Sequence, residues 1–204
     1  MSALSKFEGV AHSLLSARTE LNARLTGSRR ADQAREFSLQ GLYLTGIRSF
    51  EGFLEDQIVE IASGNHTWAT RQVGGERIAC AIRLTERRRM MVRDIILARK
   101  DYVDFLPYER TQDIAKVLFV GGRPFVNITA ADRATLTRCL RVRNYIAHRS
   151  KSAYTKFYRE YVSFRPLRIR TPRPIHYLDD NIRAGVSFFE HDVISLITIA
   201  RFLS

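Results

Sequence analysis

The sequence predicts an all-α fold, a helical bundle of long antiparallel helices with a minor β-hairpin insertion. Apolar residues recur every three or four positions over most of the chain, which is the spacing of one helix face. Only 5 of the 204 residues are Pro and 11 are Gly, so long helices can run uninterrupted. A hydrophobic fraction of 45% supports one core and excludes disordered, collagen-like and low-complexity chains. We therefore expect a single domain over residues 1–204.

Two long helices are expected first. Apolar residues keep helical spacing over 3–25, and Gly27 follows as a C-terminal stop. The same spacing continues without Pro over 31–62. These two helices should form an antiparallel hairpin.

The middle of the chain is expected to be less regular. Residues 65–82 form an insertion in which Val73-Gly74-Gly75-Glu76 is typical of a β-hairpin turn. A helix should follow over 84–104, and a shorter one over 108–119 should stop at Gly121-Gly122.

Thr129 stands three residues before Asp132, the spacing of a capping box, so a helix should begin there. We expect this helix to continue toward Tyr158. Three Pro residues make 163–176 irregular, and an apolar pattern over 186–203 predicts a final core or interface helix.

Charge is unevenly distributed along the chain. The formal net charge is +12, and residues 131–175 alone hold twelve cations against two anions, or +10. Residues 31–63 hold six anions against two cations, or −4. A field of this size attracts polyanions such as nucleic acids.

Several classes of protein are disfavoured. No apolar run reaches the roughly 18 residues of a membrane span, and the polar N-terminus does not resemble a signal peptide, so we expect a cytoplasmic protein. Cys80 and Cys139 are far apart and lack metal-ligand spacing, so neither a disulfide framework nor a zinc site is indicated. We expect no metal and no cofactor.

One stretch looks like a site: Arg141-Val142-Arg143-Asn144-Tyr145-Ile146-Ala147-His148-Arg149-Ser150. On a continuous helix, one polar stripe would hold Arg141, Asn144, His148 and either Lys151 or Ser152. Arg143 lies about 140° from His148 on such a helix, which has about 3.6 residues per turn. Arg143 can therefore join His148 only by curling around, by local distortion, or by facing a second copy of the motif.

Histidine moves protons near neutral pH, and an arginine fork binds phosphate and stabilises charge developing on it. The pair suffices for RNA cleavage without a metal, in which the 2′-hydroxyl attacks the adjacent phosphorus. Spacing alone proves little, because this composition yields a given Arg-to-His spacing about 0.7 times by chance. A second pair, Arg170 and His176, is indeed present in the Pro-rich segment.

The context of the first pair is more specific. Over Arg138 to Ser152 the chain resembles the HEPN superfamily, whose mark is an Arg, four to six residues and a His, commonly with a polar residue after the Arg. Residues 49–56 are also similar to the core helices of that family. The resemblance implies an α-helical bundle, usually a homodimer with two motifs in one cleft, and metal-independent endoribonuclease activity in toxin, antiphage and RNA-processing systems.

The resemblance implies a catalytic role for three residues: Arg143, Asn144 and His148. Around them, the candidates for substrate binding are Arg141, Arg149, Lys151 and Tyr145. Tyr145 and Tyr154 are candidates for stacking on bases, although packing at the rim of the core explains them as well. Arg48, Glu51 and Glu55 share a helix face and are candidates for positioning Arg143 or His148, or form an ordinary charged surface stripe.

The expected partners are RNA, a second copy of the chain, and an antitoxin or defence-system protein. The rival hypothesis is a non-catalytic HEPN-like module that binds nucleic acid or a protein. The blandest alternative leaves Arg143 and His148 on a solvated helix face. A DNA-binding regulator is disfavoured, because long helices replace the compact helix-turn-helix it would need.

Overall fold

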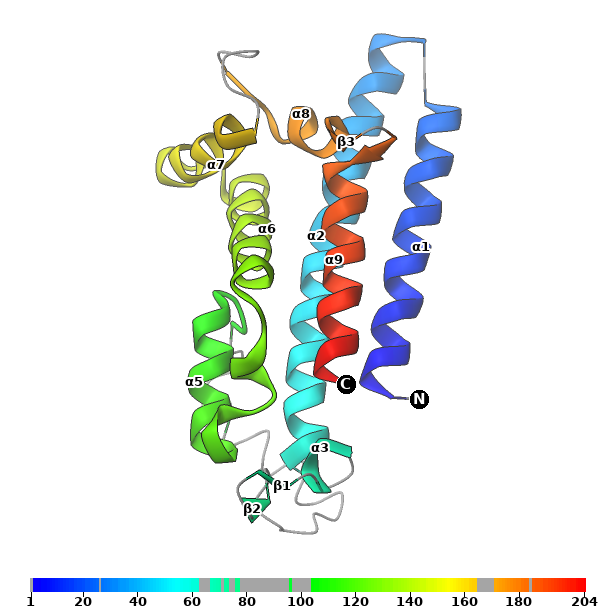
Figure 1. The fold of residues 1–204 in the computed structure, drawn as a ribbon. Helices are drawn as coiled ribbons and strands as arrows, with labels where there is room; N and C mark the ends of the chain where they lie inside the picture. The colour runs from blue at the N-terminus through cyan, green and yellow to red at the C-terminus, as the bar shows by residue number, and fades with distance from the viewer. Residues whose placement is uncertain are drawn as a thin grey trace.

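A computed structural model describes residues 2–25, 27–62, 67–70, 72–73, 76–77, 96, 104–164, 171–183 and 185–204. The chain opens with two long helices, α1 (Ala3–Arg24) and α2 (Arg29–Ala62). They run antiparallel, as Figure 1 shows. The predicted helical hairpin is therefore confirmed, with boundaries within two residues of those expected.

Helices α1 and α2 pack through aromatic rings at one end, and their backbones approach closely in the middle. The rings of Phe7, Phe50 and Phe53 pack with centroids 5.5 to 5.8 Å apart. Gly46 lets the helices approach, because a Cβ at this position would lie 3.2 Å from Cδ1 of Leu14. Full burial of each large apolar side chain stabilises the fold by about 1.5–3 kcal/mol.

The last helix, α9 (Phe188–Leu203), completes this layer beside α1 and α2. It begins at a capping box in which the Ser187 side chain accepts the N–H of Glu190, and the Glu190 carboxylate accepts the N–H of Ser187. A short antiparallel hairpin of β3 (Asn181–Arg183) and β4 (Val186–Ser187) leads into α9. This second hairpin was not predicted.

The predicted insertion after α2 contains α3 (Thr67–Thr70) and two short strands, β1 (Gln72–Val73) and β2 (Glu76–Arg77). The strands pair antiparallel, so the predicted minor β-hairpin is confirmed. The helix expected over 84–104 lies outside the described residues, apart from Ile96 and Asp104.

The second layer begins with α5 (Tyr108–Leu118), which lies beside α2 and α6 (Ala130–His148). Two short 3-10 turns, Val120–Gly122 and Phe125–Asn127, join α5 to α6. Gly122 has a φ of +70°, and a Cβ there would lie 2.8 Å from Cγ1 of Val126, so this tight turn requires glycine. The predicted stop at the glycine pair is correct.

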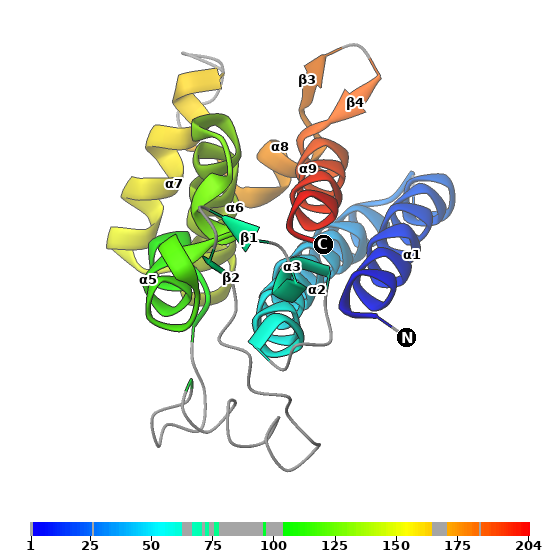
Figure 2. The same ribbon diagram turned by 60° about the horizontal axis from the view of Figure 1, so that its bottom comes forward.

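The chain then crosses the end of the bundle through α7 (Lys151–Phe164) and α8 (Pro174–Asp179). Figure 2 shows α7 next to α6, and α8 between α6 and α9. The segment expected to be irregular over 163–176 is helical at both ends, because α7 reaches Phe164 and Pro174 begins α8. Proline fits the first turn of a helix, where no backbone N–H is needed.

The buried apolar side chains of these elements form one continuous core, and the all-α class with a minor β element is confirmed. Among the described helices, none is both long and apolar enough to cross a membrane.

Candidate functional site

The motif predicted as an active site occupies the last two turns of α6. The helix is fixed at its start by Thr129, whose side chain accepts the N–H of Asp132 at 3.1 Å. It ends at His148 because the next residue, Arg149, is left-handed with φ +47° and ψ +25°. The Arg149 N–H donates to the carbonyl of Tyr145 at 3.0 Å and closes the final turn.

The expectation that this helix continues toward Tyr158 is wrong. The chain breaks at Arg149 and restarts at Ser150, whose side chain accepts the N–H of Ala153 at 3.2 Å. Serine is a favoured N-cap residue, so Ser150 was the available sequence signal for the break. Lys151 therefore belongs to α7 and does not continue the polar stripe of α6.

Arg143 has two partners, its neighbour Asn144 on α6 and Glu51 on α2. Its Nη1 donates to Oδ1 of Asn144 at 2.9 Å, and its Nη2 lies 3.9 Å from Oε2 of Glu51. The Glu51 side chain is only 5% exposed, whereas that of Arg143 is 26% exposed. The guanidinium thus stands at the rim of the core, with one edge turned toward a buried carboxylate.

Glu51 is poorly compensated for a buried carboxylate. Burial raises its pKa, and Asp104 raises it further, against the opposing effects of Arg143, the backbone N–H of Leu106 and Arg48. Its Oε2 atom is buried and accepts no hydrogen bond from the described residues. Glu51 therefore depends on the charge of Arg143, and it orients Arg143 in return.

The other two residues of that predicted set lie elsewhere on α2. Arg48 is exposed and acts on Glu51 through its charge. Glu55 lies one helical turn beyond Glu51 and is half-buried. Of the three, Glu51 is the one that the structure brings to Arg143.

His148 is exposed at the last position of α6, on a different side of the helix from Arg143. Because α6 is helical throughout, five residues still separate the two side chains by about 140° around its axis. One copy of the chain therefore places Arg143 against Glu51 and His148 in solvent.

The four predicted substrate-binding residues divide into two groups. Arg141 forms an ion pair with Glu160 of α7. Arg149, Lys151 and Tyr145 line one hollow of about 830 Å³ at the corner of α6 and α7.

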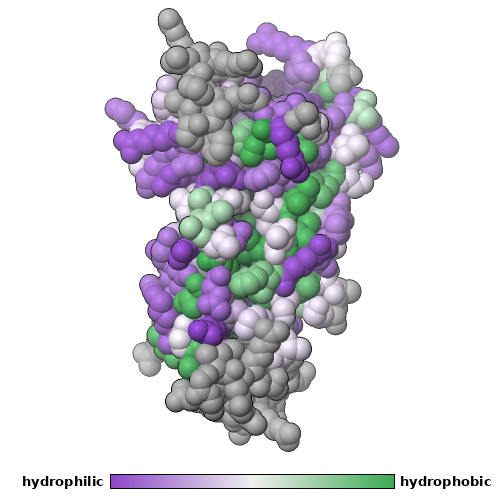
Figure 3. Space-filling view, in the orientation of Figure 1, coloured by the Kyte–Doolittle hydropathy of each residue, from purple (hydrophilic) through white to green (hydrophobic). Residues whose placement is uncertain are grey.

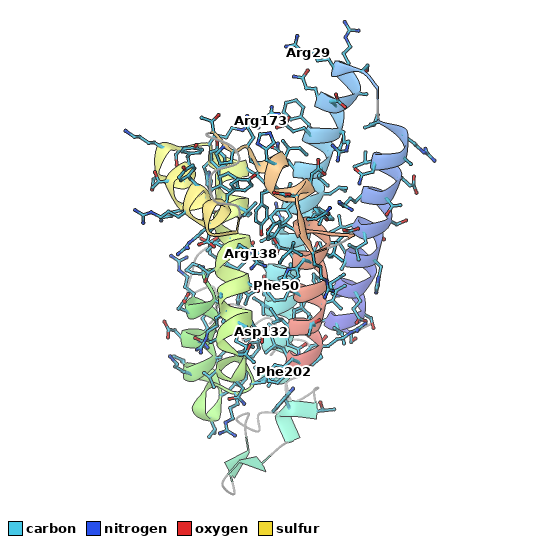
Figure 4. All side chains as sticks on the ribbon, turned by 45° about the horizontal axis from the view of Figure 1, so that its top comes forward. Arg29, Phe50, Asp132, Arg138, Arg173 and Phe202 are labelled. Atoms are coloured by element: carbon cyan, nitrogen blue, oxygen red, sulfur yellow. The ribbon has the colours of Figure 1, made fainter. Side chains whose placement is uncertain are left out.

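A second polar cluster was not predicted and lies inside the bundle. The fully buried carboxylate of Asp192 accepts hydrogen bonds from Nη2 of Arg138 at 2.6 Å and from the hydroxyls of Tyr43 and Tyr177 at 2.8 and 2.9 Å. Burial raises the pKa of Asp192, but hydrogen bonds from His191, Arg138 and Tyr43 and the charge of Arg138 outweigh it, so the pKa lies below its usual value. Figure 4 shows Arg138 in the middle of the molecule, between α6 and the layer of α2 and α9. The sequence signal for this cluster was Asp192, an acid that lies inside the apolar final helix, beyond the Glu190 of its capping box.

Comparison with known proteins does not identify a family for this chain. The chain matches no protein-family model, and no curated protein or solved structure matches it. Among the described residues, no group of three or more His, Cys, Asp or Glu side chains is placed to hold a metal ion.

Proposed function

We propose that the chain is an endoribonuclease of the HEPN type that cleaves RNA without a metal ion, with Arg143 and His148 as its key residues. The observation that supports the proposal best is the exposure of His148 at the end of α6, one residue before Arg149, which lines the hollow together with Lys151. This places a group that can move a proton beside cations that can hold phosphate.

In the proposed reaction, His148 takes the proton of a ribose 2′-hydroxyl as that oxygen attacks the adjacent phosphorus. The new O–P bond forms as the bond from phosphorus to the 5′-oxygen breaks, and the leaving oxygen takes up a proton from a water molecule, while the protonated His148 returns its proton to the solvent. Arg143 stabilises the charge that develops on the phosphoryl oxygens. The products are a 2′,3′-cyclic phosphate and a 5′-hydroxyl, and DNA is not cleaved because it lacks the nucleophile.

The proposed active form is a homodimer. Arg143 and His148 of one chain point to different sides of α6, so a complete site needs an Arg and a His from facing copies. In a two-fold interface the same surface appears on both chains, which brings two copies of the motif together.

In the cell, we propose a toxin or phage-defence role in the cytoplasm, under the control of a partner protein such as an antitoxin. Uncontrolled RNA cleavage is harmful to the cell that makes the enzyme. Expression of the chain alone should therefore stop growth, whereas expression of His148→Ala should not.

The alternative is a HEPN-like module that binds nucleic acid or a protein without cleaving. The observation that favours it is that Arg143 already has partners in Asn144 and Glu51. Under this alternative, purified protein binds RNA and leaves it intact.

The deciding experiment is incubation of purified protein with single-stranded RNA in EDTA. We expect cleavage with cyclic-phosphate ends, and a loss of about 10²–10⁴-fold in rate for His148→Ala, the usual contribution of a general acid–base. His12→Ala is the matched control, because His12 is also an exposed helical histidine, on α1. Cleavage that vanishes with EDTA and returns with magnesium would overturn the mechanism.

A further inference from the structure

The hollow at the corner of α6 and α7 combines cations with aromatic rings. Three positively charged side chains line it: Arg149, Lys151 and Arg173. Two tyrosines, Tyr145 and Tyr154, line it as well. The lining residues come from the end of α6, the start of α7 and the segment at the start of α8. The hollow therefore forms only when these three segments pack together.

The charge of this hollow is one-sided. No carboxylate is among its described lining residues. A neighbouring hollow of about 600 Å³ shares Arg149 and Arg173 but adds Asp32 and Glu36, and there Nη1 of Arg173 lies 3.1 Å from Oε2 of Glu36. The carboxylates therefore stand on the α2 side and hold Arg173 there, so Arg149 and Lys151 are the cations that the larger hollow presents without a carboxylate partner among the described residues. Figure 3 shows hydrophilic residues gathered over this end of the molecule.

The aromatic side of the hollow is held rigidly. Tyr145 stacks on the buried ring of Phe157, with centroids 4.9 Å apart and an interplanar angle of 22°. Tyr154 packs against Tyr145 at 5.3 Å. Both tyrosines remain half-buried, so part of each ring is open to a ligand. Rings fixed in this way need not be ordered when a ligand binds, which lowers the entropic cost of binding.

A histidine adds a neutral donor. His176 also lines the hollow, and its Nδ1 accepts the backbone N–H of Arg173 at 3.1 Å. Burial and the charge of Arg173 lower the pKa of His176. With Nδ1 used as an acceptor, the proton lies on Nε2, which is free to donate to a ligand.

The backbone conformation of Arg149 is a further indication that the hollow binds a ligand. Among the described residues it is the only one other than glycine with a positive φ. A left-handed conformation is unfavourable for a residue with a Cβ, and glycine would end α6 with less strain. An arginine at this position therefore lowers the stability of the corner and adds a cation to the hollow.

We propose that this hollow binds one nucleotide of single-stranded RNA, with its phosphate between Arg149 and Lys151 and its base against Tyr154 and Tyr145. Cations around a phosphate and rings beside a base are the usual way in which proteins hold single strands. Figure 4 places Arg173 at this end of the molecule, between α7 and α8. That the ligand is RNA rests on the proposed function. The arrangement of cations and rings is observed independently of that function.

The test is binding of a fluorescent 2′-O-methyl oligonucleotide, which lacks the free 2′-hydroxyl and stays uncut. We expect Tyr154→Ala to weaken binding at least about five-fold, because one stacked base contributes that much or more. Tyr154→Phe should bind as the parent does. Lys151→Ala should weaken binding and lower the slope of log affinity against log salt by about 0.7, the value for one phosphate on a single strand.

Lys156→Ala is the matched control for Lys151→Ala. Lys156 is exposed on the same helix and does not line the hollow. The inference is overturned if Lys156→Ala and Lys151→Ala weaken binding equally, or if Tyr154→Ala binds as the parent does. It is also overturned if a mononucleotide competes as well as the oligonucleotide, because the proposed ligand is a strand.

Arg149→Gly separates ligand binding from folding. We expect its melting temperature to rise, because glycine relieves the left-handed strain, while its affinity for the oligonucleotide falls. A variant that is both more stable and equally tight in binding would show that Arg149 is only a helix end.

The two proposals fail differently. If the protein binds the uncut oligonucleotide through this hollow but never cleaves RNA, the ribonuclease proposal fails and the inference about the hollow stands. If His148→Ala abolishes cleavage while the Lys151, Tyr154 and Arg149 variants bind normally, the ribonuclease stands and the inference fails.

Discussion

Helix α6 carries arginines into two opposite environments. Near its middle, Arg138 is buried and paired with the fully buried Asp192 at 2.6 Å. Just past its end, Arg149 is exposed and its Nη2 meets only the neutral Oε1 of Gln40, at 3.3 Å, among the described contacts. The two residues contribute equally to the net charge of the sequence. Only Arg138 is neutralised by a buried carboxylate. The positive charge that a polyanion meets at the surface is therefore smaller than the net charge of the sequence suggests.

The buried cluster should contribute most to stability. Asp192→Ala would leave Arg138 buried without its counter-charge, and removing one partner of a buried ion pair costs about 3–5 kcal/mol. Urea unfolding should report a loss of that size in the free energy of unfolding. Asp113→Ala is the control, because Asp113 forms an exposed pair with Lys116 on α5 and such pairs contribute about 0–1 kcal/mol.

A milder variant keeps this prediction measurable if Asp192→Ala does not fold. Tyr177→Phe removes one hydrogen bond to the ionised Asp192 and should cost about 1.5–3 kcal/mol. Equal stability of Tyr177→Phe and the parent would mean that the cluster is not a stabilising unit.

The end of α6 should affect activity, and at the exposed His148 it should do so without affecting stability. Arg143→Ala and His148→Ala chains should each be inactive, and mixing them should restore up to about a quarter of the parent activity. Half of randomly formed dimers then hold one chain of each kind, and one of the two sites in such a dimer is intact. Cleavage rate after mixing is the measurement, and light scattering should give a mass near that of two chains.

Absence of any recovery in mixtures shown to exchange subunits would mean that one chain supplies both residues. That result would require Arg143 to leave Glu51 and reach around α6, contrary to the contacts described.

The sequence predicted the regular parts of this fold because each depends on local signals. Gly27 follows within three residues of the end of the first helix, the glycine pair follows α5, and Thr129 begins α6, as expected. The cluster around Asp192 was not predictable in this way, because its partners come from α2, α6 and α8. Hydrogen bonds between distant segments leave no spacing that a single sequence can reveal.

The candidate site was predicted in part for the same reason. The spacing of Arg143 and His148 follows from one helix, but the break at Arg149 moves Lys151 onto another element. His176 lies outside the Arg143–His148 motif in the sequence, and the structure places it in the hollow with Arg149. The contact of Glu51 with Arg143 depends on how α2 packs against α6, which tertiary structure alone determines.

Two buried carboxylates differ in the same way as the two arginines. Asp192 is fully compensated by its partners, whereas Glu51 is poorly compensated. The pKa of Glu51 is raised in the folded state, so the folded chain binds its proton more tightly than the unfolded chain does. Its stabilising contribution is present below the unfolded pKa and is lost as the pH rises toward the folded pKa. Glu51→Gln should therefore gain stability relative to the parent as the pH rises from about 4 to 7.

Urea unfolding at several pH values measures this difference. Glu109→Gln, an exposed glutamate at the start of α5, controls for the change in net charge. A parent that becomes more stable than Glu51→Gln over this range would show that Arg143 outweighs burial at Glu51.

The smallest effect is expected at Arg141, which stands between the two environments. It lies on α6 among the predicted substrate-binding residues, but Glu160 of α7 already holds its guanidinium. Arg141→Ala should therefore change affinity for the uncut oligonucleotide by less than about two-fold, because an ion pair must first be broken before Arg141 can meet a phosphate. Glu160→Gln should do the opposite. By releasing the guanidinium it adds one free cation to the RNA-facing surface, and it should raise both the affinity and the salt slope, the latter by about 0.7. Together, the two variants test whether the ion pair of an arginine or its position on the surface determines its contribution to RNA affinity. If Arg141→Ala weakens binding as much as Lys151→Ala does, position decides and the pairing with Glu160 does not withhold Arg141 from RNA.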